Sequence, residues 1–187
     1  MKQVLRGVSV FLMVFASHAW CADAKDVKKS SGWGVDFKQA QKEAATLKQP
    51  ILAFFTGSDW CGWCVKLKKE VLDTSVFEKF AAENLILFEA DFPRGVTLPE
   101  ELQKQNNALA ETYGVRGFPT IYLLDAEGRK LGQTGYRAGG DKAYVSHLKE
   151  LMKSAGLDPI EKSKADVPLS TYDKMKAEKA AQAVKNP

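Results

Sequence analysis

Two cysteines separated by two residues carry the clearest chemical signal in this sequence. Cys61 and Cys64 stand in the run WCGWC, and Cys21 is the third cysteine of the 187 residues. Thiols at this spacing can form a disulfide with each other or exchange it with a disulfide of another molecule, and the attacking sulfur must then be a thiolate. A free thiol has a pKa of about 8.5, so a site of this kind has to stabilise the anion.

The residues after the motif predict a helix that begins there. Cys64, Leu67 and Val71 recur on one helical face, and charged residues occupy the other. Backbone N–H groups at a helix N-terminus present partial positive charge, so they would stabilise a thiolate at Cys61. We expect the sulfur of Cys61 to be exposed and to attack, and Cys64 to point toward the core and resolve the mixed disulfide.

The rest of the chain predicts an α/β core that positions this motif. The pattern indicates helices over 36–48, from the motif onward, from Ser75 to Asn84, from Thr97 to Gly114 and from 141 to 155, and strands over 51–55, 85–88, 120–124 and 129–136. Asp36 and Ser75 are expected to cap their helices, each with a partner three residues later, and 85–88 is expected to be a second buried strand. The first strand is a continuous apolar run, which is typical of a strand buried on both faces.

Both ends of the chain differ from this core in composition. Residues 1–24 have the layout of a secretory signal, with cleavage expected after Ala24 and Ala19 as the second choice. Residues 25–32 read as a flexible leader, 33–156 as the folded domain and 157–187 as a charged C-terminal tail, in which 171–184 could form a solvated helix. We therefore expect an exported, periplasmic protein that loses Cys21 with its signal; a lipid anchor on Cys21 is a weaker alternative.

The CxxC spacing also occurs in zinc sites, haem attachment sites and structural disulfides, which differ in the residues that accompany the two cysteines. A structural zinc site needs four ligands, and the expected mature chain offers only His147 beside the two thiolates, so we expect no metal. A covalent haem needs His after the second Cys, where Val65 stands. An inert disulfide staple stays open, although so short a loop restrains the unfolded chain little. Trp60 and Trp63 either pack in a core or, as we expect, form a flat apolar surface around the sulfur.

Composition narrows the class of partner. Apolar residues make up 45% of the chain, and the formal charge of +4 comes from 27 basic and 23 acidic residues that are mixed along it. A chain of this kind can bury one sizeable core. Since no basic block is present, nucleic acid is not an expected partner.

Two motifs together give a family resemblance. WCGWC at 60–64 and YGVRGFPT at 113–120 stand in the order, and between the elements, seen in the thioredoxin superfamily, and residues 33–155 resemble that family. The stretch 57–64 is similar to exported bacterial thioredoxin-like proteins. The resemblance implies a thioredoxin-like fold, a central mixed sheet flanked by helices.

The family also implies roles for single residues. Cys61 and Cys64 match the attacking and resolving cysteines, and Pro119 matches a proline whose preceding peptide bond is cis. The resemblance then places the Phe118 backbone beside the sulfurs, where it can pair with an extended substrate strand. From the sequence alone, a trans bond before Pro119 is the commoner form. Where thioredoxin has Gly-Pro between its cysteines, this chain has Gly62 and Trp63, so the direction of electron flow stays open. The buried acid that the family has in the strand before the motif is absent from the apolar run 51–55, so proton transfer at Cys64 would need water or another group.

These observations lead to one main hypothesis and two alternatives. We expect a thiol–disulfide oxidoreductase that reduces or exchanges disulfides of protein substrates through Cys61 and Cys64. It needs no small cofactor, and we expect its electrons to come from another dithiol, in a membrane-embedded reductant system. The substrate-binding residues are expected to be Trp60, Gly62, Trp63, Phe118 and Pro119. The alternatives are a disulfide oxidase and a non-catalytic module that binds peptides and keeps the disulfide as a clip.

Overall fold

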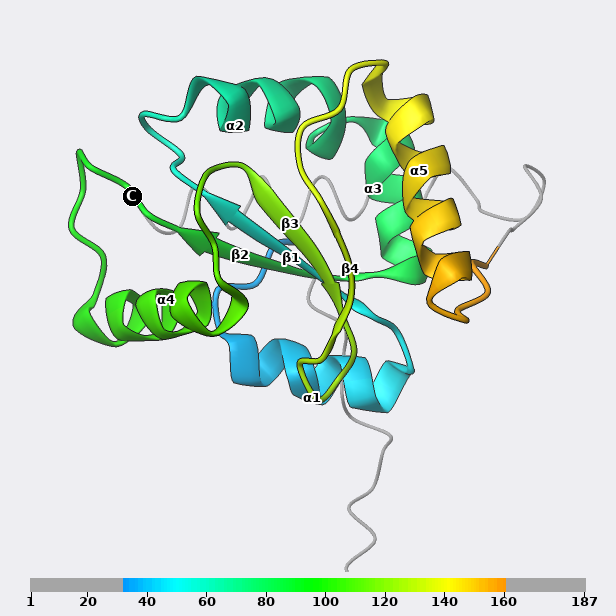
Figure 1. Cartoon of the computed structure of the whole chain (residues 1–187), viewed down its shortest axis with the longest axis horizontal. Coiled ribbons are helices and arrows are strands. Elements are labelled where there is room, and N and C mark those ends of the chain that lie inside the picture. Colours follow the sequence, from blue (N-terminus) through cyan, green and yellow to red (C-terminus); the bar gives the residue numbers. More distant parts are fainter. Residues whose placement is uncertain (1–31, 161–187) are drawn as a thin grey trace, which may run out of the picture.

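A computed structural model describes residues 32–160, which form an α/β fold (Figure 1). The helices are α1 (Phe37–Leu47), α2 (Gly62–Leu67), a π-helical turn η1 (Lys68–Leu72), α3 (Ser75–Asn84), α4 (Glu100–Tyr113) and α5 (Gly140–Ser154). The strands are β1 (Ile51–Thr56), β2 (Ile86–Asp91), β3 (Thr120–Leu124) and β4 (Lys130–Thr134). Each predicted element is confirmed, with ends that differ by a few residues.

The four strands form one mixed sheet in the order β2-β1-β3-β4. β2 runs parallel to β1, β3 runs antiparallel to β1, and β4 closes the sheet as the hairpin partner of β3. All six residues of β1 are buried, as its apolar run predicts. β2 alternates between buried and half-buried residues: in the run 85–88, which is predicted to be buried, only Leu87 is half-buried, and the strand continues past this run to Glu89 and Asp91. Its polar residues fall on the face that the motif helix covers.

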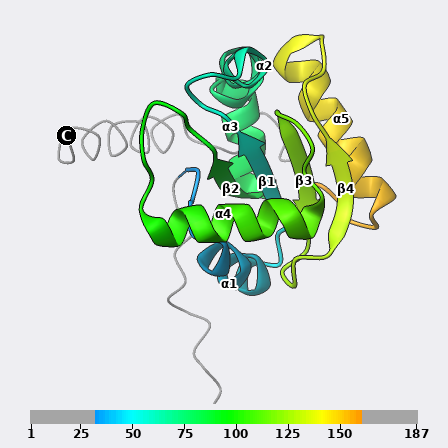
Figure 2. The same cartoon turned by 60° about the vertical axis from the view of Figure 1, so that its left-hand side comes forward.

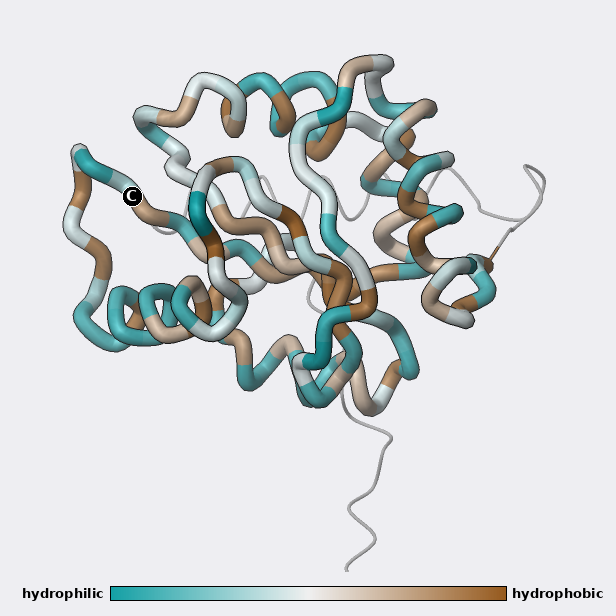
Figure 3. The backbone as a smooth tube through the Cα atoms, viewed as in Figure 1, coloured by the Kyte–Doolittle hydropathy of each residue, from teal (hydrophilic) through white to brown (hydrophobic). Residues whose placement is uncertain are grey.

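Helices cover the sheet on both faces (Figure 2). On one face, α1 and α4 pack over a cluster that includes Phe55, Phe88 and Tyr122. On the other face, α2, α3 and α5 pack over a cluster that includes Phe54 and both cysteines of the motif. Hydrophobic and hydrophilic residues alternate along the helices (Figure 3), and the buried apolar residues of the helices belong to these two clusters. The motif is thus anchored in one of the two cores.

The N-terminal ends of the helices agree with the sequence-based prediction at α1 and differ from it at α3 and α4. Asp36 caps α1 by accepting a hydrogen bond from the backbone N–H of Gln39 at 3.0 Å, as predicted. The predicted cap at Ser75 is one residue late, because the Thr74 hydroxyl accepts from Phe77 and Ser75 is already helical. The predicted start of α4 at Thr97 is also early.

At α4 the chain stays extended through Pro99, and the helix begins at Glu100. A proline fixes φ near the helical value but offers no side-chain acceptor, so Pro99 leads into the helix without capping it.

The helix that begins at the motif changes its winding after one and a half turns. α2 passes at Lys68 into η1, where the backbone N–H of Asp73 donates to the Lys68 carbonyl at 2.8 Å. Such wide turns inside helices are rare and occur often at functional sites. Here the turn places the Lys68 ammonium 3.7 Å from the carboxylate of Glu89 on β2.

Several sequence-based predictions fall on residues outside 32–160. These are the signal peptide, nearly all of the leader, the fate of Cys21 and the tail beyond Ile160, and they stay predictions. The first residues of the tail, 157–160, are described: the Asn84 side chain accepts a hydrogen bond from the backbone N–H of Ile160, and Leu157 packs against the core. None of the helices described is long and apolar enough to cross a membrane.

The corrected caps give a matched pair of substitutions. Thr74→Ala removes the hydrogen bond to Phe77 and should lower the free energy of unfolding by about 1 kcal/mol. Thr97→Ala makes the same change at an exposed residue before α4 and should alter it by less than about 0.5 kcal/mol. Urea denaturation measures both, and equal losses would contradict the assigned caps.

Candidate functional site

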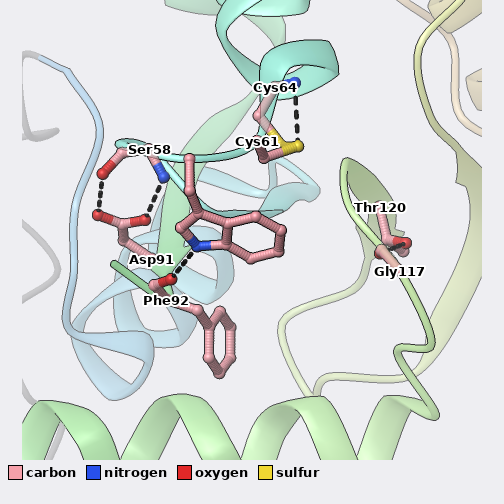
Figure 4. Close-up of a disulfide and its surroundings, with 8 residues drawn as sticks. Ser58, Cys61, Cys64, Asp91, Phe92, Gly117 and Thr120 are labelled. Atoms are coloured by element: carbon pink, nitrogen blue, oxygen red, sulfur yellow. Dashed lines mark hydrogen bonds between the residues drawn. A yellow bond between two sulfur atoms is a disulfide. The ribbon is translucent and has the colours of Figure 1, made fainter. Parts of the chain in front are cut away.

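The two cysteines stand at the start of α2, as the sequence predicts (Figure 4). Cys61 is the N-cap residue, with extended backbone, and its sulfur accepts a hydrogen bond from the backbone N–H of Cys64 at 3.2 Å. The two sulfurs form a disulfide. The same N–H, together with the other amides of the first turn, would stabilise negative charge on Cys61 once the disulfide is reduced.

Both cysteines are buried in this oxidised form, which corrects the expectation of an exposed Cys61 sulfur. Cys61 is 6% exposed and Cys64 is 1% exposed. Two interactions cause the burial: the bond to Cys64 and the hydrogen bond from its N–H both turn the Cys61 sulfur over the first turn of the helix. Cys61 is still the more accessible of the two, in agreement with an outer and an inner sulfur.

Trp60 is exposed and tightly held. Its indole N–H donates to the Phe92 carbonyl at 2.8 Å, and the guanidinium carbon of Arg94 lies 3.8 Å from the ring centroid. Phe118 meets the same ring edge-on, with centroids 5.8 Å apart. Gly57 lies behind the indole, where a Cβ atom would collide with it. Trp60 is 39% exposed in spite of these contacts, so it presents a fixed aromatic surface.

Asp59 fixes the loop between β2 and α4 onto the turn before the motif. Its carboxylate accepts hydrogen bonds from the backbone N–H groups of Arg94, at 3.0 Å, and Gly95. The bonds from Gly95 and then from Arg94 lower the pKa of Asp59. A second carboxylate, Asp91, binds the backbone N–H and the hydroxyl of Ser58. The loop from 92 to 99 is therefore part of the site, a role that the sequence left undetermined.

Trp63 lies on the other side of the motif and is 57% exposed. Its ring contacts Tyr136 with centroids 4.9 Å apart, and the Lys66 ammonium lies 5.1 Å from the Trp63 ring. Tyr136 in turn donates to the carboxylate of Glu70 at 2.9 Å. Both tryptophans are exposed, as expected, and they flank the disulfide.

The peptide bond between Phe118 and Pro119 is cis, as the family resemblance implies. The turn that contains it ends at Thr120, whose hydroxyl donates to the Gly117 carbonyl at 2.7 Å, and it lies across from the disulfide (Figure 4). Phe118 packs against the core cluster that holds both cysteines. The remaining predicted residue, Gly62, is exposed, with open space where a side chain would stand.

Glu89 is the residue of this region that the sequence analysis missed. Its side chain is 15% exposed and lines a cavity of about 270 Å³ together with Cys64, Lys68 and Thr56. Burial raises the pKa of Glu89, and the nearby Lys68 partly offsets that effect. A signal was present, since Glu89 continues the apolar run 85–88 as a charged residue inside a strand.

The described residues offer little for a metal. Within 32–160, no three His, Cys, Asp or Glu side chains gather closely enough to hold an ion. His147, the third zinc ligand considered above, pairs with the Thr134 hydroxyl at 3.0 Å instead.

Comparisons with known proteins agree with this geometry. The sequence pattern of the thioredoxin-like domain matches residues 37–142. The disulfide bond reductase DsbH of Chlamydia pneumoniae is 41% identical over 117 residues, which cover 63% of this chain and 70% of that protein. The thioredoxin-related protein DsbJ of the same organism is 27% identical over 130 residues, which cover 66% of this chain and 37% of DsbJ.

Solved structures show the same fold. A DsbH oxidoreductase superposes with a TM-score of 0.63 at 38% identity, over 69% of this chain and 90% of that one. A thioredoxin from Thermus thermophilus superposes with a TM-score of 0.51 at 15% identity, over 68% of this chain and 92% of the other, which supports the fold alone. From its domain match, its resemblance to DsbH and its paired cysteines, this chain belongs to the thioredoxin-like family and is a thiol–disulfide oxidoreductase.

Proposed function

We propose that this protein reduces or exchanges disulfides of exported protein substrates, with Cys61 as the attacking residue and Cys64 as the resolving residue. The observation that carries the proposal is the placement of Cys61 at the N-cap of α2, where the backbone N–H of Cys64 already reaches its sulfur. The 41% identity to a protein named disulfide bond reductase favours reduction over oxidation.

The exchange proceeds in two steps. The Cys61 thiolate attacks one sulfur of a substrate disulfide, which forms a mixed disulfide and releases the other substrate sulfur as a thiolate. Cys64, after losing its proton, attacks the Cys61 sulfur. The Cys61–Cys64 bond forms, the bond to substrate breaks, and the substrate leaves with both sulfurs reduced. Each cycle oxidises the enzyme dithiol and reduces one substrate disulfide by two electrons.

The surface around the disulfide is suited to a polypeptide substrate. Trp60 and Trp63 expose aromatic rings on either side of it, and Val65, which follows Cys64 in α2, is also exposed. Gly62 leaves the space above the first turn of α2 open. We assign substrate binding to these residues, because apolar rings with fixed positions bind peptides at low entropic cost.

The cis-Pro119 turn supplies the backbone side of the same surface. The turn between Gly117 and Thr120, which contains Pro119, lies across from the disulfide (Figure 4), and we assign pairing with an extended substrate segment to the Phe118 backbone in this turn. Residues 92–99, held by Asp59, form the opposite edge. The Phe92 and Phe118 rings of these two loops contact each other, with centroids 5.2 Å apart, so the substrate would lie over the loops, against the exposed ring of Trp60.

The electron donor is proposed to be another dithiol, in a membrane-embedded reductant system of the compartment to which the chain is exported. The residues described provide no cluster for a metal, and the chemistry requires none. The periplasmic location rests on the secretory pattern of residues 1–24.

The first prediction separates the two cysteines. With dithiothreitol as electron source, the protein should accelerate insulin-disulfide reduction, and Cys61→Ser should fall to the uncatalysed rate because no attacking thiolate remains. Cys64→Ser should instead accumulate mixed disulfides with substrate. They should appear as complexes on non-reducing gels and disappear when a reducing agent is added. A wild-type protein that leaves insulin untouched, with Cys61 slow toward alkylating agents, would favour the non-catalytic binding module.

The reduction potential distinguishes reductase from oxidase. A reductase should have a value near the about −270 mV of thioredoxin, whereas a strong oxidase lies near about −120 mV. The reduction potential is measured by equilibrating the protein with glutathione buffers and determining the fraction of free thiol. A potential near the oxidase limit would overturn the proposed direction.

The role of Asp59 can be tested in the loop that it holds. Asp59→Ala removes the acceptor of two amides, so the N–H groups of Arg94 and Gly95 should lose protection from hydrogen exchange, measured by NMR. Asp59→Asn keeps a side-chain oxygen and should retain most of the protection. Because the pKa of Asp59 is lowered, the wild-type contact should persist at neutral pH and be lost only as pH falls through that depressed value. Equal exchange in all three proteins would contradict the assignment.

A further inference from the structure

Cys64 has a chemical requirement that its surroundings make hard to meet. To attack Cys61 in the mixed disulfide it must first lose a proton, yet it is 1% exposed. The strand beneath it, β1, contributes only apolar side chains and Thr56. A buried thiol in apolar surroundings has a raised pKa and reacts slowly unless a base takes its proton.

We propose that Glu89 of β2 is the proton acceptor for Cys64, acting across the cavity that the two side chains share. This inference rests on the proposed function, since it concerns the second step of the exchange. Cys64 and Glu89 line the same cavity of about 270 Å³, which has room for a water molecule to relay the proton.

The pairing of the strands explains how Glu89 reaches this place. In the parallel register of β1 and β2, Glu89 lies beside Phe54, so both side chains leave the sheet on the same face. Phe54 belongs to the core cluster that contains Cys64. The polar group that β1 does not supply under the motif is therefore supplied by the neighbouring strand.

Other carboxylates of the region are engaged elsewhere. Asp59 binds the amides of the 92–99 loop and Asp91 binds Ser58. Glu43 is buried, but it lies on α1, which packs against the opposite face of the sheet, and it accepts a hydrogen bond from Gln39. Asp73 lines the same cavity but is exposed. Glu89 combines burial with access to Cys64.

Lys68 makes the buried carboxylate tolerable. Its ammonium lies 3.7 Å from the Glu89 carboxylate, and both Lys68 and Lys69 line the cavity. Burial raises the pKa of Glu89; Lys68 lowers it, and the negative charges of Asp91 and Asp73 raise it. The net effect is a rise, which brings the carboxylate closer to the pKa of a thiol and makes it a better base.

The proton and the electron pair move in one sequence of steps. The Cys64 thiol gives its proton to the Glu89 carboxylate, and the thiolate attacks the Cys61 sulfur of the mixed disulfide. The Cys61–Cys64 bond forms and the bond between Cys61 and the substrate breaks, with its electron pair leaving on the substrate sulfur. Glu89 then releases the proton to solvent past Lys68 and Asp73, at the exposed side of the cavity. The thiolate that leaves takes up a proton from solvent.

Ellman's reagent can follow the two steps separately by stopped flow. Attack by Cys61 of the reduced protein releases a first coloured thiolate, and resolution by Cys64 releases the second. Glu89→Gln should leave the first release unchanged and slow the second about 100-fold near neutral pH, the size expected for loss of a positioned base. Glu111→Gln, the same change on the exposed surface of α4, is the matched control and should alter neither release.

The pH dependence gives a readout that a structural role would not change. In the wild type, the second release should slow as pH falls through the pKa of Glu89, because the protonated carboxyl cannot accept a proton. In Glu89→Gln this acid limb should move up to the pKa of the Cys64 thiol. Lys68→Gln should move it upward by a smaller amount, since loss of the ammonium raises the pKa of Glu89.

Each outcome decides the inference. A Glu89→Gln protein with the wild-type rate and pH profile of second release would overturn it, as would an unshifted profile in Lys68→Gln. If Glu89→Gln does not fold, Lys68→Gln decides alone, because this lysine side chain is 40% exposed and its replacement leaves the core unchanged. Failure of the proposed function looks different: the first release would then be missing from the wild type.

Discussion

The hydrogen bond from the backbone N–H of Cys64 to the sulfur of Cys61 is the contact on which the rest of the site depends. It requires an extended backbone at Cys61 and a helix from Gly62 onward, so the chain must leave β1, turn at Gly57 and begin α2 within a few residues. The same geometry that caps the helix also brings the second sulfur within bonding distance of the first. One local arrangement thus provides both thiolate stabilisation and the means of resolution.

The two tryptophans beside the disulfide have different surroundings. Trp60 is held by a hydrogen bond to Phe92, by the Arg94 guanidinium and by the edge of Phe118, all from segments distant in sequence. Trp63 contacts Tyr136 and lies more open to solvent. A fixed ring on one side and a more accessible ring on the other give a surface that orients a peptide while it accepts some variety of side chains.

Glu89, the carboxylate near Cys64, lies on β2 and not on the central strand β1. β1 lies in the middle of the sheet and is buried along its whole length, where a carboxylate would be costly. β2 is an edge strand, so Glu89 can be largely buried against Cys64 and still pair with Lys68 at the surface. Because Glu89 pairs with Phe54 in the parallel register, its side chain lies on the face of the sheet that holds the motif, and the central strand needs no charged residue.

The sequence by itself determined the elements that depend on neighbours along the chain. The apolar run of β1, the Asp36 cap, the start of α2 at Cys61 and the β3–β4 hairpin all follow from periodicity and turn chemistry within a few residues. The cis bond at Pro119 followed from family resemblance, since local sequence favours trans. Where two cap residues stand side by side, as at Thr74 and Ser75, local signals could not choose between them.

Only the tertiary structure decided the burial of Cys61, the loop held by Asp59 and the position of Glu89 under Cys64. Asp59 lies 35 residues before Arg94, and Glu89 meets Cys64 through the register of β1 with β2. Periodicity states which face of a strand is apolar, but not which strand lies beside it. Long-range contacts arise from how strands pair and helices cover them, because a hydrogen bond or an ion pair depends on distances in space that the order of residues does not contain.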